Sequence, residues 1–391
     1  MKRRTYRTHL IGCILMGCVL LLGIISCGND DNTLDEADPE CSVLPEVDWE
    51  HDSFKILKGV NISGWLSQTS TRKVGVDAFF TKKDAQKLAG WGFDHIRLPV
   101  DEVEIFTEKG EWKEKERGLI HKAVEWCKDL NMRVILDFHI LRSHYFNDTE
   151  NMTLWSSKAE QDKLSDMWKK LSAEFNQYPN SLLAYELLNE PVPDTPGQWN
   201  KLSSRLINEL RVLEPDRMIV LDASSHSSIG ALSTLEIPQN DPNIILSVHF
   251  YTPHLLTHYQ AGWWPALKRL TIKLHYPGQL VSHQDVDTIR DSENLRVVNY
   301  YNGYYDKAIL TEKIQIALDK SKETGLQIHI GEVGCIENTD PTVRLNWMSD
   351  VAAICKEHNV AFSVWGYKAG FGIMNDNGTA KDQRVIDVLT R

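Results

Sequence analysis

Two glutamates at the ends of short apolar segments are the side chains in this sequence best placed to do chemistry. Glu190 follows the apolar run 182–188, and Glu332 ends the segment 327–332. Apolar residues at nearly every position of 182–188 predict a strand buried on both faces. Because Pro191 has no amide hydrogen, we expect strand pairing to end at Glu190. On its own, the Asn-Glu-Pro sequence is equally consistent with a polar turn.

A pair of carboxyl groups suits the cleavage of a glycosidic bond. One carboxyl must be protonated to give a proton to the leaving oxygen, and the other must be ionised to attack the anomeric carbon. Their surroundings must differ, since a cation or a hydroxyl donor favours the charged form and an apolar wall favours the neutral one. Arg97 and Tyr251 are candidates for holding one glutamate ionised, and Trp365 offers a flat apolar face to a pyranose ring.

Eight short apolar segments that alternate with helical patterns position these residues. The predicted strands are 56–64, 93–100 (stopped by Pro99), 133–139, 182–190, 218–222, 244–251, 327–332 and 361–366. The predicted helices are 82–90, 115–130, 158–177, 197–213, 310–324, 343–357 and 382–391. This alternation predicts a parallel sheet covered by helices. Eight strands, nearly all ending in a polar residue, favour a closed (β/α)8 TIM barrel with a long insertion after strand six.

In a closed barrel the carboxyl ends of the strands converge on one cup, so residues far apart in sequence are expected to meet there. The candidates are Arg97, His139, Asn189, Glu190, His249, Tyr251, Glu332 and Trp365. His249 and Tyr251 alternate on one strand face, which we expect to point inward because helices cover the outside. Two alternatives stay open: His139 as a hydrogen-bonded core histidine and Arg97 as a structural ion pair.

Taken together, the chain resembles glycoside hydrolase family 5, the cellulase family of retaining enzymes, over roughly residues 54 to 391. The resemblance is carried by GVNISGWL at 59–66, HIRLP at 95–99, ILDFH at 135–139, LLNEP at 187–191, HFY at 249–251, GEVG at 331–334 and WGYKAGFG at 365–372. Each motif is weak alone, whereas their order, spacing and strand context together are specific.

The resemblance implies a (β/α)8 fold and double displacement with retention, with Glu190 as the acid/base and Glu332 as the nucleophile. Retention needs carboxyl groups about 5–5.5 Å apart, and inversion about 6.5–9.5 Å, so we expect the shorter separation. The supporting roles it implies are Arg97 beside the nucleophile, His139 and His249 binding sugar, Asn189 hydrogen-bonded to the sugar 2-hydroxyl, Tyr251 hydrogen-bonded to the nucleophile, and Trp365 as the platform under the sugar being cleaved.

The first 27 residues have the pattern of a targeting segment. A basic start (Lys2, Arg3, Arg4 and Arg7) precedes the apolar run 10–25, which is shorter than the roughly 20 residues of a spanning helix. The run ends in ISC at 25–27, which resembles a bacterial lipobox. We therefore predict a lipoprotein signal peptide at 1–26, a lipidated Cys27, and an acidic stalk to residue 53 before the catalytic domain at 54–391. A plain signal peptide is the alternative.

Composition limits the class of partner. The net charge is −11 and becomes more negative once the basic segment is removed, so the chain is a poor ligand for nucleic acid. The seven cysteines are scattered without a Cys-x-x-Cys pair, which argues against a zinc cluster or a disulfide scaffold. Cys127 and Cys355 fall on apolar helix faces and are expected to be buried thiols. We expect neither cofactor nor metal, and a monomer.

The expected activity is hydrolysis of a β-linked glycan, with a β-1,4-glucan or a related plant polysaccharide as substrate, by an outer-membrane lipoprotein facing the cell surface or the periplasm. The alternatives are an exo-acting β-glycosidase on oligosaccharides, a non-catalytic glycan-binding lipoprotein, and a metal-dependent barrel hydrolase. The aromatic residues of 252–309 allow two interpretations, which are platforms for further sugar units and self-packing of a long loop. They are Trp263, Trp264, Tyr300, Tyr301, Tyr304 and Tyr305.

Overall fold

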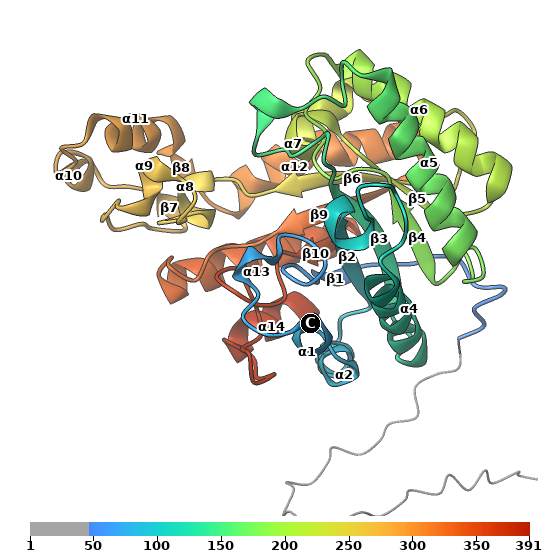
Figure 1. The fold of residues 1–391 in the computed structure, drawn as a ribbon. Coiled ribbons are helices and arrows are strands. Elements are labelled where there is room, and N and C mark those ends of the chain that lie inside the picture. The colour runs from blue at the N-terminus through green and yellow to red at the C-terminus, as the bar shows by residue number, and fades with distance from the viewer. Residues whose placement is uncertain (1–46) are drawn as a thin grey trace, which may run out of the picture. The chain divides into compact units, whose positions relative to one another are not determined.

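Eight parallel strands close into a barrel in which each strand pairs with the next barrel strand along the chain, and the last pairs with the first (Figure 1). They are β1 (Lys58–Asn61), β2 (His95–Asp101), β3 (Arg133–Ile140), β4 (Leu183–Glu186), β5 (Ile219–Asp222), β6 (Ile244–Phe250), β9 (Gln327–Val333) and β10 (Ala361–Val364). The structure is a computed structural model that describes residues 47–391. The predicted (β/α)8 fold is confirmed.

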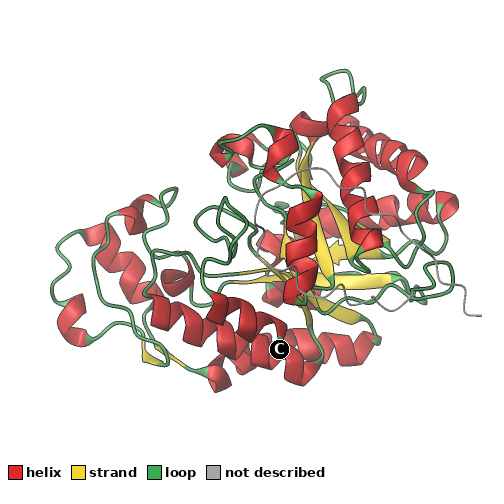
Figure 2. Ribbon diagram, turned by 90° about the horizontal axis from the view of Figure 1, so that it is seen from below, coloured by secondary structure: helices red, strands yellow, loops and turns green. Residues whose placement is uncertain are grey.

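Helices surround the strands (Figure 2). The longer ones of the barrel are α2 (Lys82–Trp91), α4 (Glu114–Asp129), α5 (Lys158–Phe175), α6 (Pro196–Leu213), α12 (Lys307–Thr324), α13 (Pro341–His358) and α14 (Gln383–Thr390). Short helical segments connect them: α1 (Val76–Phe79), α3 (Glu102–Ile105), α7 (Ser224–Ser227) and the 3-10 turns η1 (Thr69–Thr71), η2 (Thr149–Asn151) and η3 (Ile229–Thr234). In the part of the chain that the structure describes, no helix has the length and apolar character needed to cross a membrane.

Local sequence explains where these helices begin and end. The Asp340 carboxylate accepts hydrogen bonds from the amides of Thr342 and Val343, and so satisfies donors that the first turn of α13 leaves unpaired. The same helix ends at Asn359, whose φ of 54° is the left-handed conformation that asparagine tolerates. At α2, Thr81 forms a capping box, since its side chain accepts from the amide of Asp84 and Asp84 accepts from the Thr81 amide.

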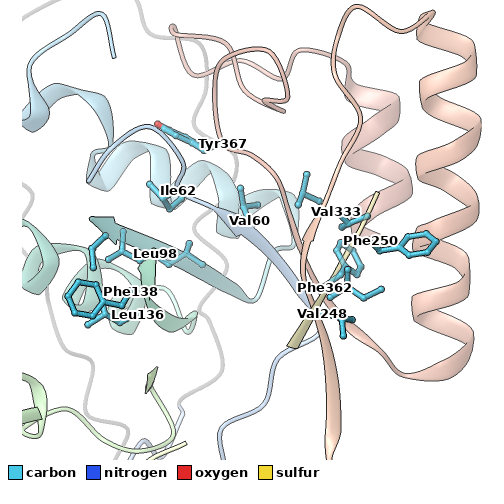
Figure 3. Close-up of a cluster of buried hydrophobic side chains, with 14 of the residues drawn as sticks. Val60, Ile62, Leu98, Leu136, Phe138, Val248, Phe250, Val333, Phe362 and Tyr367 are labelled. Atoms are coloured by element: carbon cyan, nitrogen blue, oxygen red, sulfur yellow. The ribbon is translucent and has the colours of Figure 1, made fainter. Parts of the chain in front are cut away.

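Alternate residues of each strand face the helices and form the larger hydrophobic core. Figure 3 shows part of this core, with side chains from six of the barrel strands (Val60, Leu98, Leu136, Phe138, Val248, Phe250, Val333 and Phe362) and from neighbouring loops (Ile62 and Tyr367). The intervening residues point into the barrel. At its amino end they form a separate apolar cluster, which Phe54 and Ile56 join from the segment before β1; its strand members are Ile135, Ala184, Val220, Ile245 and Ala361.

Polar side chains lie further along the barrel interior. The hydroxyl of Ser363 is 2.9 Å from Nε2 of His95 and 2.9 Å from Nε2 of His329. The ring of His95 lies over Gly59, where a Cβ atom would be 2.1 Å from Nε2. Gly59 is therefore required by the close approach of an imidazole rather than by a turn.

Pro99 does not stop β2, which continues to Asp101, so that prediction was wrong. The odd-numbered residues of β2 direct their backbone amide and carbonyl groups towards β1 and the segment that follows it. The Ile62 amide donates to the carbonyl of Arg97, and the Asp101 amide donates to the carbonyl of Leu66. Since β1 ends at Asn61, no strand lies opposite the missing amide of Pro99.

The prediction that strand pairing ends at Glu190 was also wrong, because β4 ends at Glu186. Beyond it the chain keeps two isolated bonds, from the Leu187 amide to Val220 and from the Asn189 amide to Phe138. Glu190 then has a φ of 43°, which is uncommon for a residue other than glycine. Such backbone strain is frequent at functional sites.

The predicted insertion after strand six is present and forms one compact unit with the barrel (Figure 1, yellow to orange). It is less irregular than expected, because it contains α8 (His254–Thr257), α9 (Pro265–Lys268), α10 (His283–Val286), α11 (Ser292–Tyr301) and an antiparallel pair, β7 (Gly278–Gln279) with β8 (Tyr304–Tyr305).

The predicted signal peptide (1–26), Cys27 and the stalk up to residue 46 lie outside the described residues. Trp49, which lies in the predicted stalk, contacts the barrel. The Trp49 ring lies 5.0 Å from the guanidinium carbon of Arg133, and the carbonyl of Trp49 accepts a hydrogen bond from the Ser181 hydroxyl. Cys127 and Cys355 are buried free thiols, as predicted.

Candidate active site

Glu190 and Glu332 meet at the carboxyl end of the barrel although 141 residues separate them in the chain. Glu332 lies near the end of β9, and Glu190 lies four residues beyond the end of β4. One oxygen of each carboxyl group and one nitrogen of His249 all lie within 4.8 Å of one another. Glu332 is 6% exposed, so the two acids face each other in a largely enclosed site.

Arg97, on β2, is fully buried and organises the floor of this site. Its Nη1 donates to Oε1 of Glu332 at 3.1 Å. Its Nε and Nη2 donate to the two oxygens of Glu186 at 2.8 and 2.7 Å, which is a bidentate ion pair. Nη2 also reaches Oδ2 of Asp137 at 2.9 Å and Oδ1 of Asn189 at 2.8 Å. Arg97 therefore makes a structural ion pair and also contacts a candidate catalytic carboxylate.

The sequence interpretation missed Glu186. Burial raises the pKa of this carboxyl, but the charge and hydrogen bonds of Arg97 outweigh burial and lower the pKa. An ionisable residue inside an otherwise apolar strand was the available signal, because such a group is rarely buried without a partner. Asn61 was missed as well; its Oδ1 accepts from Nη1 of Arg97 at 2.9 Å and its Nδ2 donates to the carbonyl of Gly331 at 2.8 Å.

Asp222 is another buried carboxyl at this end of the barrel that the sequence interpretation missed. Its Oδ1 accepts hydrogen bonds from Ser227 at 2.6 Å and from Ser247 at 3.2 Å. Burial, together with the neighbouring charge of Glu186, raises its pKa well above the ordinary value. Asp222 is therefore a neutral acid, although Nε2 of His249 lies 4.0 Å from its Oδ1.

Asn189 has its amide group fixed in orientation by Arg97. Since Oδ1 accepts from Nη2 of Arg97, Nδ2 must point the other way. Among the described residues, Nδ2 has no hydrogen-bond partner although Asn189 is buried. A buried amide with an unused donor is suited to a hydroxyl group of a ligand.

Both oxygens of Glu332 accept a hydrogen bond, one from Arg97 and the other from the Tyr251 hydroxyl at 2.9 Å. Burial and the negative charge of Glu332 raise the pKa of Tyr251 well above its ordinary value, so the phenol keeps its proton and remains a donor. The two donors hold the carboxylate in one orientation. The structure thus brings Arg97 and Tyr251 to the same glutamate.

Glu190 is paired with His249, whose Nδ1 lies 2.8 Å from its Oε1 and 3.6 Å from Oε2 of Glu332. Burial lowers the pKa of His249, but the charges of Glu332 and Glu190 outweigh burial and raise it. Burial raises the pKa of Glu190, but the hydrogen bond and charge of His249 lower it. The pair therefore shares one proton in the hydrogen bond between Nδ1 of His249 and Oε1 of Glu190. Moving this proton to Glu190 gives a neutral imidazole and a protonated Glu190.

His139 and Trp365 form the wall beside the acids. Their rings are stacked at 5.5 Å with an angle of 9°, and Trp365 is partly exposed. Nδ1 of His139 is hydrogen-bonded to Asp137 at 2.7 Å, and Nε2 lies 3.1 Å from the side-chain amide nitrogen of Gln68. Burial lowers the pKa of His139 to about 4, so the ring is neutral. The structure thus brings all eight predicted side chains to one end of the barrel.

Two sets of three side chains in the described residues lie close enough to share an ion. One is Glu186, Asp222 and His249, and the other is Glu190, His249 and Glu332. Both sets need His249, and donors from Arg97, Tyr251, His249 or serine already contact their carboxyl groups. That no metal is needed stays a prediction, which full activity in EDTA would support.

Comparison with known proteins identifies the class. Residues 53–370 match the family described as Cellulase (glycosyl hydrolase family 5). Endoglucanase C of Acetivibrio thermocellus is 29% identical over 345 residues, covering 87% of this chain and 98% of that protein. Cellodextrinase A of Ruminococcus flavefaciens is 24% identical over 341 residues, covering 86% of this chain and 94% of that protein.

Solved structures share the fold. A hyperthermophilic endo-β-1,4-glucanase, solved in complex with substrate, has a TM-score of 0.69 at 21% identity and covers 86% of this chain and 97% of its own. Thermotoga maritima Cel5A, solved in complex with mannotriose, has a TM-score of 0.69 at 20% identity, covering 85% and 97%. The chain belongs to glycoside hydrolase family 5, as the resemblance implied. It is a glycosyl hydrolase of the endo-β-1,4-glucanase-like kind.

Proposed function

We propose that this protein hydrolyses β-1,4-linked glucan with retention of configuration, using Glu332 as nucleophile and Glu190 as acid/base. The observation that carries the proposal is that oxygens of the two carboxyl groups lie within 4.8 Å of each other and have different partners. This close approach of two oxygens supports the carboxyl separation of about 5–5.5 Å that retention needs, rather than the roughly 6.5–9.5 Å of an inverting mechanism.

In the first step, an oxygen of Glu332 attacks the anomeric carbon and the bond to the leaving oxygen breaks. Glu190 gives its proton to that oxygen, and a covalent glycosyl-enzyme forms. The proton is available because the Glu190–His249 pair retains one between its members. When Glu332 loses its charge in the ester, Arg97 remains paired with Glu186, so the floor stays charge-balanced.

In the second step, Glu190 takes a proton from water as the water attacks the anomeric carbon, and Glu332 leaves as a carboxylate. The free Nδ2 of Asn189 is the donor in the site best placed for the sugar 2-hydroxyl, and its partner Arg97 prevents the amide from turning away. Trp365 supplies the ring face on which the sugar being cleaved stacks, with His139 behind it.

The relatives and the character of the site support the proposed substrate class. The relatives named above include endoglucanases and a cellodextrinase, and one neighbouring structure was solved with mannotriose. The candidate sugar-binding groups His139, Trp365 and the Asn189 amide are uncharged, which suits a neutral polysaccharide. Product lengths from a β-glucan distinguish the endo action proposed here from exo action, since an exo-acting enzyme releases one short product from the start.

The test replaces each acid by its isosteric amide. Glu190→Gln and Glu332→Gln should each lower kcat on a β-1,4-glucan by roughly 1,000-fold or more, because the residues act as a unit. Azide should restore turnover of the Glu190→Gln variant on an aryl glycoside, whose leaving group needs no proton, but not of Glu332→Gln. Circular dichroism spectra should match the native protein. Retained activity in either variant would contradict the assignment.

The same proposal extends to the amino terminus, whose residues lie outside the described part of the chain. The signal and lipobox-like pattern support lipid attachment at Cys27 and an outer-membrane location. Metabolic labelling with a palmitate analogue should mark the native protein but not Cys27→Ala, and the label should follow the outer-membrane fraction. A labelled Cys27→Ala variant would contradict this assignment.

A further inference from the structure

The insertion between β6 and α12 divides its aromatic side chains into two groups. Trp264 and Tyr301 are partly buried and pack against the hydrophobic core. Trp263 and Tyr300 instead remain 63% and 79% exposed. Self-packing therefore explains some of these aromatic residues, but it does not explain the two that present their rings to solvent. Large exposed rings that adjoin one another commonly mark a binding surface.

Ring contacts connect Trp263 to the catalytic site through Phe371, in the loop after β10. The ring of Tyr251, whose hydroxyl donates to Glu332, lies 6.1 Å from Phe371, and Phe371 lies 6.0 Å from Trp263. His258 makes a second connection, at 4.9 Å from Tyr251 and 6.2 Å from Trp263. The exposed indole is thus two ring contacts away from the residue that holds Glu332.

The platform inside the site packs on a buried cluster that two of these aromatic residues share. Trp365, Tyr251 and Trp264 all pack against one small apolar cluster, which consists of Ala261, Ile336 and Phe371. A second series of rings leads from it across the insertion, because Trp264 lies 5.9 Å from Tyr301 and Tyr301 lies 4.8 Å from Tyr300. The rings therefore continue without interruption from the catalytic end of the barrel to the outer side of the insertion.

The histidines within this aromatic surface do not attract anions. Burial lowers the pKa of His258 to about 3, and burial also lowers that of His254. Both rings are therefore neutral at neutral pH. Exposed aromatic faces beside neutral imidazoles suit a ligand with a flat apolar side and a polar edge, which describes a pyranose ring.

We propose that Trp263 and Tyr300 form an accessory sugar-binding surface that holds a more distant part of the same neutral polysaccharide whose cleavage occurs at Glu190 and Glu332. This inference rests on the proposed function. The surface acts on affinity for long chains and takes no part in bond cleavage, because the ring contacts of Trp263 and Tyr300 among the described residues are with His258, Phe371 and Tyr301.

The test compares Trp263→Ala, Tyr300→Ala and the double variant with Tyr304→Ala as the matched control. Tyr304 is 59% exposed in the same insertion and makes none of the ring contacts found among the described residues. Each protein is assayed on cellohexaose and on an aryl β-cellobioside, which has far fewer sugar units to extend beyond the catalytic site. The double variant should lose about 5- to 10-fold in kcat/KM on cellohexaose through KM, with less than a 2-fold change on the aryl substrate.

Equal losses on both substrates, no loss on cellohexaose, or an equal loss in Tyr304→Ala would overturn the inference. If the native protein cleaves neither substrate, the proposed function fails, and binding of cellohexaose measured by calorimetry then decides the inference separately. Weaker binding by the double variant than by Tyr304→Ala supports the surface, and equal binding overturns it. The native protein could also be a dimer that dissociates in the double variant while the ratio of kcat/KM between the two substrates is unchanged. That result would assign the rings to self-association and overturn the inference.

Discussion

The two ends of the barrel interior are built from the same strands but contain opposite kinds of side chain. Moving two residues along a strand keeps the side chain inside the barrel and replaces an apolar residue by an acid. The pairs are Ile135 and Asp137 on β3, Ala184 and Glu186 on β4, and Val220 and Asp222 on β5, and all six are buried. The amino end thus contributes to stability by excluding water, whereas the carboxyl end places charge where chemistry needs it.

The carboxyl end of the barrel reduces the free-energy cost of burying these acids in two ways. Arg97 compensates Glu186 and contacts Glu332, as a buried cation can when its donors are arranged in a fork. Burial raises the pKa of Asp137 and of Asp222 well above the ordinary value, so these two acids stay neutral. Two structural acids are therefore protonated while a third pairs with arginine, and the floor avoids an excess of negative charge.

Among substitutions at the two ends of the barrel, removal of Arg97 should have the largest effect on activity and stability. Arg97→Met leaves Glu186 and Glu332 without their cation, so kcat should fall by roughly 100- to 1,000-fold and the free energy of unfolding by about 3–5 kcal/mol. Arg97→Lys is the control that keeps the charge but loses the fork, and it should recover stability better than activity. Assays on an aryl cellobioside with urea unfolding measure both. A fully active Arg97→Met variant would contradict the role given to the floor.

A cavity at the amino end should affect stability alone. Ile135→Ala removes a buried side chain from the apolar cluster and should lower the free energy of unfolding by about 2–5 kcal/mol. Ile135 is the register partner of Arg97, but the guanidinium of Arg97 is held at the far end of its side chain by Glu186 and Glu332, so kcat/KM of the folded fraction should stay within about 2-fold of native. Measurement well below the unfolding midpoint separates the two quantities. A large loss of kcat/KM would show that the two ends are coupled.

Asp222→Asn should have the smallest effect and a distinctive pH dependence. Because the folded pKa of Asp222 is raised, ionisation of this group opposes folding, and its contribution to stability is lost as pH rises from about 4 through the folded pKa. Asparagine is always neutral, so the stability of the variant relative to native should increase between pH 4 and pH 8. Urea unfolding at both pH values measures this difference. A relative stability that falls with pH would mean that native Asp222 is charged.

Much of the fold and site could be predicted because strand ends carry a strong local signal. Asn189 and Glu332 each follow or end an apolar run, and closure of the barrel brings such residues together. Glu186 could not be assigned in the same way. Its partner Arg97 lies 89 residues earlier, and a pattern that predicts burial on both faces does not identify the cation that balances the charge of Glu186. An ion-pair partner that is distant in sequence can be identified only once the register of the strands is known.

Two errors have the same origin. Pro99 and the end of β4 were assigned from local hydrogen-bonding capacity, yet the neighbouring strand decided both outcomes. β1 ends before it could need the Pro99 amide, and beyond Glu186 only isolated bonds continue. The role of the aromatic residues in the insertion could not be predicted for a similar reason. Trp263 and Trp264 are adjacent in sequence, but Trp263 is exposed and Trp264 packs against the core.

The stereochemistry of the first product tests the central claim most directly, that Glu332 attacks the sugar while Glu190 protonates the leaving oxygen. Proton NMR spectra recorded within minutes of adding the protein to a β-linked cello-oligosaccharide show which anomer forms before mutarotation equalises the two. The separation of the two carboxyl groups, with oxygens within 4.8 Å, predicts that the β anomer appears first. Initial release of the α anomer would show inversion and contradict the double displacement.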